Sequence, residues 1–314
     1  MGSGSRIRQY ERRFYEGERV REEREDEIFH SVGFFGEYEV REAEGGGYEL
    51  IRKNEVIGIF SEAKVEKGRI VFKLSHGVNL EVTEKGIREI FSPERAELCG
   101  LIAADGSISK YQEKKGKSTM YKICLKTNDQ ELAEVFSRLF KETYGVTSHR
   151  YIGHHTAEGK ERQHYEEVVY SKKVAYDLWN FNIKGPGRYE FHPPTKYLDE
   201  EGKKAYIRGF FSGDGSVTLT PKEHHISIHS SCRECLEELR KMLIDLGFHP
   251  GEIGIYDKEP SPKRHSHPSF RFYIPEEDHL KFIEEIGSER EMHINKFKQI
   301  KLIDEERRKR RNEI

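Results

Sequence analysis

The 314-residue sequence predicts an α+β fold with two pseudo-symmetric αββαββα halves, preceded by a small, mainly β domain. The first observation is a repeat: an apolar, helix-like stretch that ends in Asp-Gly-Ser occurs at residues 98–107 and again at 207–216. The second observation is that the same order of strand-like and helix-like patterns follows both copies. We therefore expect one half over residues 92–198 and the other over 199–300.

The chain before the first copy changes character near residue 28. Residues 1–27 combine a Gly/Ser start with a run of charged side chains, which is typical of a leader and a solvated arm. Residues 28–91 contain short β-type runs separated by glycine-containing turns, which predicts a small antiparallel β domain closed by a short helix near 84–91. The predicted strands cover 48–51, 56–60, 70–74 and 78–82.

The first half is expected to begin with a helix. Ser92 occupies the N-cap position, Pro93 the first helical position, and Gly106 follows the last turn, a combination that marks a helix start and end. Alternating strand-like runs and helical apolar stripes follow. The further expected elements are strands at 107–111 and 121–127, a helix at 131–144, strands at 147–155 and 164–170, and a helix at 171–181.

The second half repeats this order. Residues 226–230 match residues 123–127 in pattern, so the duplication extends well beyond the ten-residue motif. The basic tail over 301–314 is either a solvated helix end or a contact to nucleic acid. The expected elements of this half are a helix at 200–214, strands at 216–220 and 225–230, a helix at 234–246, strands at 252–257 and 269–274, and a helix at 276–286.

Composition limits the possible classes of protein. Hydrophobic and charged residues each make up 35% of the chain, and no apolar run reaches about 18 residues, so we expect an intracellular protein, cytoplasmic or nucleoid-associated, without a membrane span. The net charge of −2 neither supports nor excludes nucleic acid as a partner. Many lysines and glutamates with few cysteines and methionines fit a protein from a thermophile.

The four cysteines fall into two groups. Cys99 and Cys124 lie in apolar runs and are expected to be buried thiols. Cys232 and Cys235 have CxxC spacing, but no second Cys/His pair follows at zinc-finger spacing, so a structural role is favoured over a metal or redox role.

The repeated motif predicts a close helix pair. Gly100 and Ala104 are four residues apart, as are Gly209 and Gly213, and such a stripe of small residues lets two helix backbones approach closely. The C-terminal ends of the two helices would then lie side by side. Asp105 and Asp214, which stand at those ends, become neighbours.

Two neighbouring carboxylates at helix C-termini are unfavourable on their own, because each faces the negative end of a dipole and each repels the other. A divalent cation relieves both effects, and Mg²⁺ prefers a few carboxylates together with water and substrate phosphates. The pair therefore predicts metal-assisted phosphodiester hydrolysis. The alternative is that each Asp-Gly simply caps a helix, and the repetition of the motif argues against it.

The strands after each motif carry polar side chains on the face opposite the core. Hydroxyl, basic and histidine side chains on a sheet face suit groove readout and phosphate contact, although an ordinary solvated face is the alternative. The basic loops 110–117 and 258–264 would reach flanking phosphates. The candidate DNA-binding residues are Ser107, Ser109, Tyr111, Lys122, Ser216, Thr218, Thr220, His225, Ser227, Arg271 and Tyr273.

Over residues 93–300 the chain resembles the LAGLIDADG homing endonucleases in their single-chain, two-motif form. The resemblance implies a saddle of antiparallel sheets astride double-stranded DNA, and cleavage of both strands at a long asymmetric site. It also implies Mg²⁺, with Mn²⁺ or Ca²⁺ able to occupy the same site, and it makes Asp105 and Asp214 the metal ligands. Lys126, His229 and Lys296 are then the candidates for supporting catalytic residues.

The chain departs from the family pattern at two positions. Ala103 and Ser212 stand where the family name carries an acid, two residues before each candidate ligand, and that acid is not a metal ligand. No splicing residues stand at the chain ends, so we expect a free-standing enzyme of the intron-encoded kind and not an intein. The resemblance to the single-chain, two-motif form implies a monomer. The competing interpretation keeps the fold without cleavage, as a DNA-binding regulator or as an RNA-splicing maturase that binds RNA. What residues 28–91 contribute stays open.

Overall fold

The structure is a computed structural model, and the chain divides at residue 90 into two compact units, which are described separately below. The residues described are 31–35, 37–43, 46–66, 68–112, 119–157, 160–181, 183–184, 190–220, 224–257 and 268–312. The expected leader and charged arm over 1–27 lie outside these residues, as do most of the two basic loops. Within the described part of the chain, every helix is too short or too polar to cross a membrane.

The N-terminal unit consists of two four-stranded sheets, in the orders β1-β2-β3-β4 and β5-β6-β7-β8. Val40 and Leu50 from the first sheet share one core with Ile70, Phe72 and Val82 from the second. The eight strands are β1 (Ser31–Phe35), β2 (Tyr38–Glu42), β3 (Tyr48–Arg52), β4 (Glu55–Phe60), β5 (Ala63–Glu66), β6 (Arg69–Lys73), β7 (Val78–Thr83) and β8 (Gly86–Phe91).

One expectation for this unit is wrong. The segment near 84–91 forms strand β8 and not a short helix. Gly86 has a φ of +130°, which ends the turn after β7, and the strand that follows pairs with β7. Ile87 packs against the shared core, so sheet pairing decides the conformation of this short segment.

The C-terminal unit contains two αββαββα halves, as the sequence predicts. The first sheet has the strand order β9-β10-β12-β11 and the second β13-β14-β16-β15, so corresponding strands hold corresponding places. The first half comprises α2 (Pro93–Ala104), β9 (Gly106–Gln112), β10 (Thr119–Thr127), α3 (Gln130–Tyr144), β11 (His149–Ala157), β12 (Lys160–Tyr170) and α4 (Lys172–Asn180). The second comprises α5 (Glu200–Asp214), β13 (Gly215–Leu219), β14 (His224–Ser230), α6 (Arg233–Asp245), β15 (Gly254–Asp257), β16 (Ser269–Ile274) and α7 (His279–Glu285).

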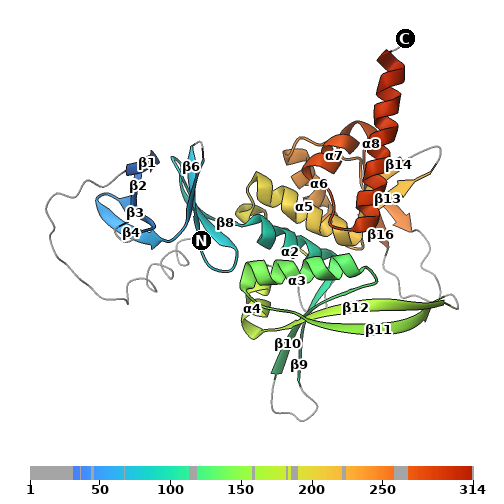
Figure 1. The fold of residues 1–314 in the computed structure, drawn as a ribbon, viewed down its shortest axis with the longest axis horizontal. Coiled ribbons are helices and arrows are strands. Elements are labelled where there is room, and N and C mark those ends of the chain that lie inside the picture. The colour runs from blue at the N-terminus through green and yellow to red at the C-terminus, as the bar shows by residue number, and fades with distance from the viewer. Residues whose placement is uncertain are drawn as a thin grey trace. The chain divides into compact units, whose positions relative to one another are not determined.

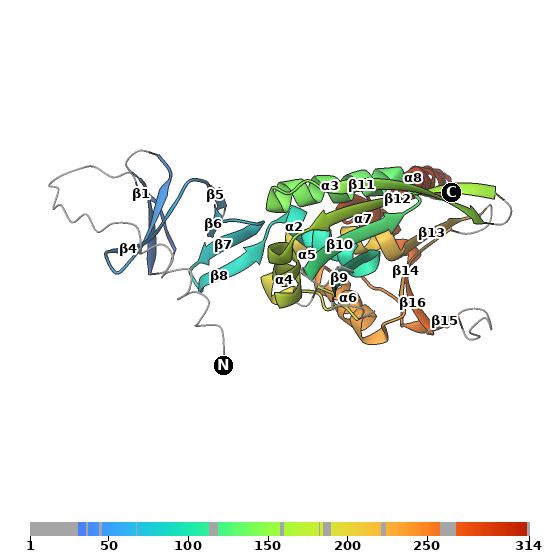
Figure 2. The same cartoon turned by 90° about the horizontal axis from the view of Figure 1, so that it is seen from below.

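Helices α2 and α5 lie side by side at the centre of this unit (Figure 1). Seen from below, strands of the first half lie in front of them (Figure 2). Both helices begin at side-chain caps, because Ser92 Oγ accepts the Arg95 amide at 3.3 Å and Asp199 Oδ1 accepts the Gly202 amide at 2.8 Å. A final helix, α8 (Glu291–Asn312), includes most of the expected basic tail.

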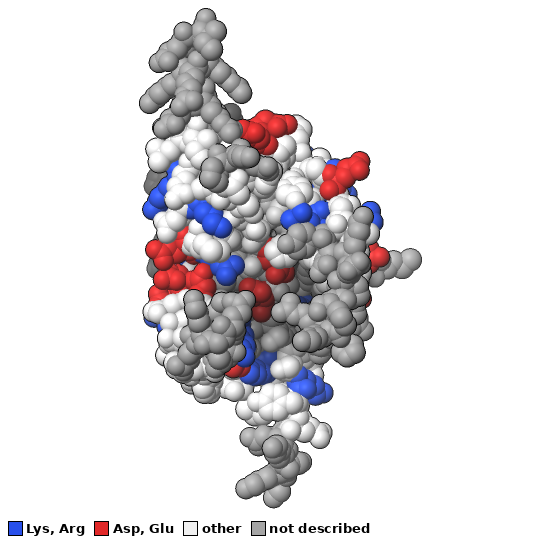
Figure 3. Space-filling view, turned by 90° about the vertical axis from the view of Figure 1, so that its right-hand side faces the viewer, with Lys and Arg blue, Asp and Glu red and all other residues white. Residues whose placement is uncertain are grey.

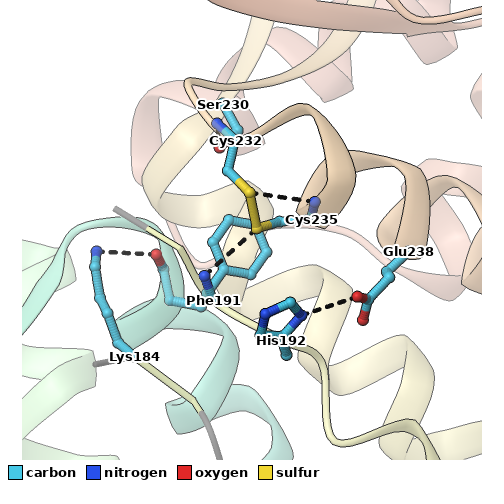
Figure 4. Close-up of a disulfide and its surroundings, with 8 residues drawn as sticks. Lys184, Phe191, His192, Ser230, Cys232, Cys235 and Glu238 are labelled. Carbon is cyan, nitrogen blue, oxygen red and sulfur yellow. Dashed lines mark hydrogen bonds and ion pairs between the residues drawn. A yellow bond between two sulfur atoms is a disulfide. The ribbon is translucent and has the colours of Figure 1, made fainter. Parts of the chain in front are cut away.

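Two of the four cysteines are free thiols and the other two form a disulfide. Cys99 and Cys124 are buried and free, and burial raises the pKa of each thiol to about 12. Cys232 and Cys235 form a disulfide in the first turn of α6, with Cα atoms 5.4 Å apart. The Phe191 amide donates to Cys235 Sγ at 3.4 Å (Figure 4). The disulfide therefore lies against the segment that links the two halves.

Candidate active site

Helices α2 and α5 touch through their backbones. A Cβ atom at Gly100 would lie 2.0 Å from the carbonyl oxygen of Tyr206, and one at Gly209 would lie 2.0 Å from the carbonyl oxygen of Glu97. Real side-chain atoms do not approach this closely, so both positions require glycine. The close backbone contact that the spacing of small residues predicts is therefore present.

This contact brings the two motif aspartates together. Asp105 caps the C-terminus of α2, and Asp214 is the last residue of α5. A Cβ atom at Gly213, the residue before Asp214, would lie 2.6 Å from Ala104 Cβ and 3.3 Å from Asp105 Oδ2. The Asp105 carboxylate therefore contacts the last turn of α5, which ends at Asp214.

Burial dominates the electrostatics of both carboxyls, and for Asp214 the like charge of Asp105 adds to it. Burial and the neighbouring Asp105 carboxylate raise the pKa of Asp214 to about 7. Burial also raises the pKa of Asp105, while the charges of Arg290 and Lys184 oppose that increase. Asp105 nevertheless keeps part of its side chain accessible to solvent, whereas Asp214 is half-buried. Protein therefore surrounds both carboxyls, and solvent reaches the site on the Asp105 side.

Two basic residues lie close enough to act on both carboxyls. Lys184 Nζ donates to the carbonyl oxygens of Ala103 and Ala104, each at 3.0 Å. Figure 4 shows the extended Lys184 side chain with one of these bonds. Burial lowers the pKa of Lys184, and the charges of Asp214 and Asp105 oppose that decrease. Figure 3 shows acidic side chains near the middle of one face, with lysines and arginines around them.

Arg290 reaches the site from the second half. Its Nε atom donates to Asp129 Oδ2 at 3.0 Å, and Asp129 caps the N-terminus of α3 in the first half. Sequence reasoning singled out neither Lys184 nor Arg290. The sequence offers no shared spacing that would find both, because Lys184 directly follows Ile183 whereas Arg290 stands four residues after Ile286.

The three basic residues that were expected to support catalysis lie on other elements. Lys126 is exposed on β10, opposite Glu166 of β12. Lys296 of α8 donates its Nζ to the carbonyl oxygen of Val217. His229 is half-buried on β14, and burial together with Arg271 lowers its pKa. A catalytic role for these three stays a prediction.

The candidate DNA-binding residues differ in accessibility. Those exposed are Ser107, Tyr111, Thr218, Thr220, His225 and Tyr273, and those half-buried are Ser109, Lys122, Ser216 and Arg271. Ser227 is only 4% exposed, so the expectation that it faces solvent is wrong. It sits on a central strand between Ser216 and Tyr273, and neighbours on both sides leave little of a small side chain accessible.

Several of these side chains already have protein partners. Lys122 pairs with Glu166 across the sheet. The Arg271 guanidinium lies 4.4 Å from the centre of the Tyr273 ring, and the His225 ring lies 5.7 Å from it. The second sheet therefore presents a connected aromatic and cationic surface, whereas the Lys122 charge on the first sheet is neutralised within the protein.

The carboxylate pair fits a divalent cation. Hard carboxylate oxygens are the ligands that Mg²⁺ prefers. The raised pKa of Asp214 reflects burial and, beside it, the repulsion of Asp105, and a bound cation would oppose both. Among the described residues, no cluster of three or more His, Cys, Asp and Glu side chains could hold a metal ion. Asp105 and Asp214 are the residues that would hold such an ion, with water and substrate oxygens completing its coordination.

Comparison with known proteins agrees with this architecture. The model of the LAGLIDADG-like domain matches residues 92–178 and 201–287. The "Probable cell division protein WhiA" of Clostridium perfringens is 36% identical over 67 residues, and this match spans 21% of each chain, about a fifth of the length of these curated relatives.

Two solved structures are among those to which the chain is similar. The crystal structure of I-DmoI in complex with DNA and Mn has a TM-score of 0.45 at 22% identity, covering 62% of this chain and 96% of that one. Full-length DUF199/WhiA from Thermatoga maritima has a TM-score of 0.43 at 19% identity, covering 68% of this chain and 60% of that one. Because the domain model matches both repeats and more than half of the chain, this protein belongs to the LAGLIDADG-like domain family, in a two-domain form.

Proposed function

We propose that this protein is a site-specific endonuclease that hydrolyses both strands of double-stranded DNA at a long, asymmetric target with the help of a divalent cation. The observation that carries the proposal is the pair of Asp105 and Asp214, one from each repeat, at the joined ends of α2 and α5. A helix cap does not require two carboxyls to lie together, and burial together with the Asp105 charge raises the pKa of Asp214. A cation-binding function explains why such a pair would be kept.

Each residue of the site has a defined task in this proposal. Asp105 and Asp214 would hold Mg²⁺, or Mn²⁺ or Ca²⁺ in its place, and the bound cation would activate water and stabilise the leaving oxygen. Lys184, fixed on the C-terminal carbonyls of α2, places a positive charge where negative charge develops on the scissile phosphate. Asp214 must be ionised to bind the cation, so metal binding releases a proton below about pH 7.

The two sheets would bind the DNA. The exposed hydroxyl and aromatic side chains of β9 and β13–β16 would contact base edges, and the cationic side chains beside them would contact phosphates. The two halves differ in sequence, so the recognised site is asymmetric. Because one chain supplies both aspartates, the protein would act as a monomer, and we propose an intracellular, intron-encoded enzyme.

The test is a selection for bound sites from a random DNA library, followed by incubation of the selected DNA with Mg²⁺. We expect double-strand cleavage by the natural protein, and a loss of about 100- to 1000-fold or more in Asp105→Asn and Asp214→Asn without loss of DNA binding. Asp245→Asn is the matched control, because Asp245 is exposed on α6 and pairs with Lys203.

Two outcomes would reject the endonuclease. One is a specific DNA site that is bound but never cut with Mg²⁺ or Mn²⁺, which would indicate a cleavage-deficient regulator. The other is tight binding of structured RNA with no preference for any DNA sequence, which would indicate a maturase.

A further inference from the structure

A buried cluster of hydrogen-bonding side chains lies behind the last turn of α5. Ser212 is fully buried, His293 is 1% exposed and Ser288 is 9% exposed. Ser212 Oγ lies 3.2 Å from Ser288 Oγ, which in turn lies 3.0 Å from His293 Nδ1. The three residues, called the serine–histidine cluster below, come from α5, from the loop after α7 and from α8.

The proton positions in this cluster follow from counting donors. Ser212 Oγ lies 2.8 Å from the Arg208 carbonyl oxygen and donates its one proton there. Ser288 must then donate to Ser212, and the Nδ1–H of His293 must donate to Ser288. This assignment satisfies every contact at once. His293 is uncharged at neutral pH, because burial and the nearby Arg290 and Lys296 charges lower its pKa to about 4.

The oxygen atoms of the two serines also accept hydrogen bonds from backbone amides of the loop that carries Arg290. The amide of Glu289 donates to Ser212 Oγ at 2.9 Å, and the amide of Arg290 donates to Ser288 Oγ at 3.2 Å. The Arg290 carbonyl accepts from His293 and Ile294 at the start of α8. The backbone of Arg290 is therefore held on both sides, and its guanidinium extends to Asp129 of the first half.

We propose that the serine–histidine cluster positions Arg290 beside the carboxylate pair, so that Ser212, Ser288 and His293 act in DNA cleavage through Arg290. The proposal rests on the endonuclease function for its consequence in catalysis. The first half positions its basic residue in a different way. Ala103 stands where the second half has Ser212 and carries no hydroxyl, and Lys184 donates directly to the carbonyl oxygens of its helix. Ser212 is thus a positioning residue for the arginine.

The first experiment needs neither DNA nor metal. Solvent exchange of the Arg290 Nε–H is followed by NMR of arginine-labelled protein, with Arg290→Lys assigning the signal. We expect slow exchange in the natural protein because of the bond to Asp129, and about tenfold faster exchange or more in Ser212→Ala. Ser230→Ala is the matched control, because Ser230 is also buried and also accepts a backbone amide, that of Cys232.

Two further variants keep this result interpretable. Ser288→Ala removes the second hydroxyl from a loop position and should also speed the exchange, even where Ser212→Ala folds poorly. Ser212→Thr keeps the hydroxyl and should retain slow exchange. Unchanged Arg290 exchange in Ser212→Ala or in Ser288→Ala, in folded protein, overturns the proposal.

The second experiment is a double-mutant cycle on single-turnover DNA cleavage. We expect Ser212→Ala to cleave about 10- to 100-fold more slowly, with a DNA Kd within about twofold of the natural value. The double variant Ser212→Ala/Arg290→Gln should cleave at the rate of Arg290→Gln alone. Rates that multiply would show that Ser212 acts independently of Arg290 and would overturn the proposal. Failure of the natural protein to cut any bound DNA counts against the endonuclease alone, because the exchange measurement still decides the position of Arg290.

Discussion

The two halves of the C-terminal unit share one topology but place their basic residues near the carboxylate pair by different means. In the first half, Lys184 reaches the C-terminal carbonyls of its own motif helix α2. In the second half, Arg290 is held by a buried hydroxyl cluster and crosses over to Asp129 of the first half. The two halves thus share the paired helices and aspartates, while the positive charge near them is held by different contacts in each half.

The largest effect is expected where the halves are most alike, at the glycines of the helix pair. Gly209→Ala and Gly100→Ala should each lower the free energy of unfolding by about 3–5 kcal/mol or prevent folding, because the added methyl group would meet a backbone carbonyl. Chemical denaturation measures the loss. Gly254→Ala on β15 is the control, because open space surrounds its Cβ position. A small loss of unfolding free energy at one of the two glycines, with a large loss at the other, would show that the two halves contribute unequally to the helix contact.

The next prediction separates the two basic residues. Lys184→Met should slow cleavage about 100-fold, because it removes a charge that lies close to both aspartates. Arg290→Gln should have a smaller effect, since Arg290 shares its charge with Asp129. Single-turnover rates at saturating protein measure both. Equal losses would mean that the two charges are equivalent despite their different contacts.

A third prediction uses the raised pKa of Asp214. Because the folded protein holds a proton on Asp214 up to about pH 7, and the unfolded chain releases it near pH 4, the metal-free stability should fall as pH rises between these values. Asp214→Asn should remove this decrease and stabilise the metal-free protein at pH 8 by on the order of 2 kcal/mol. Thermal unfolding in the presence of a chelator, from pH 4 to pH 8, tests the sign. A natural protein that gains stability over this range would contradict it.

The smallest effect concerns the helices that follow the first hairpin of each half. Helix α3 is capped by Asp129, whereas α6 is capped by the sulfur of Cys232, which is in the disulfide with Cys235. Cys235→Ser should lower the free energy of unfolding by about 1–2 kcal/mol, because the closed loop is very short. The same decrease on adding a reductant to the natural protein, and no further decrease in the variant, would identify the disulfide as the cause.

Much of the fold could be predicted because the relevant signals are local. Both αββαββα units follow from apolar periodicity and from caps such as Ser92 and Asp199, which act within one turn of their own helix. The segment near 84–91 was mispredicted because so short a pattern fits either a strand or a helix, and pairing with β7 decides between them. Ser227 was predicted to be exposed because alternation gives the face of a side chain but not how far its neighbours cover it.

The sequence by itself determined the duplication, the close contact of the motif helices and the meeting of Asp105 with Asp214, because small residues four apart and an acid at a helix end are local patterns. Only the tertiary structure decided which basic residues join them. Lys184 contacts a residue 80 positions away and Arg290 one 161 positions away. Contacts of that separation leave no periodic trace in the chain, since they depend on how whole halves pack and not on the neighbours of either residue.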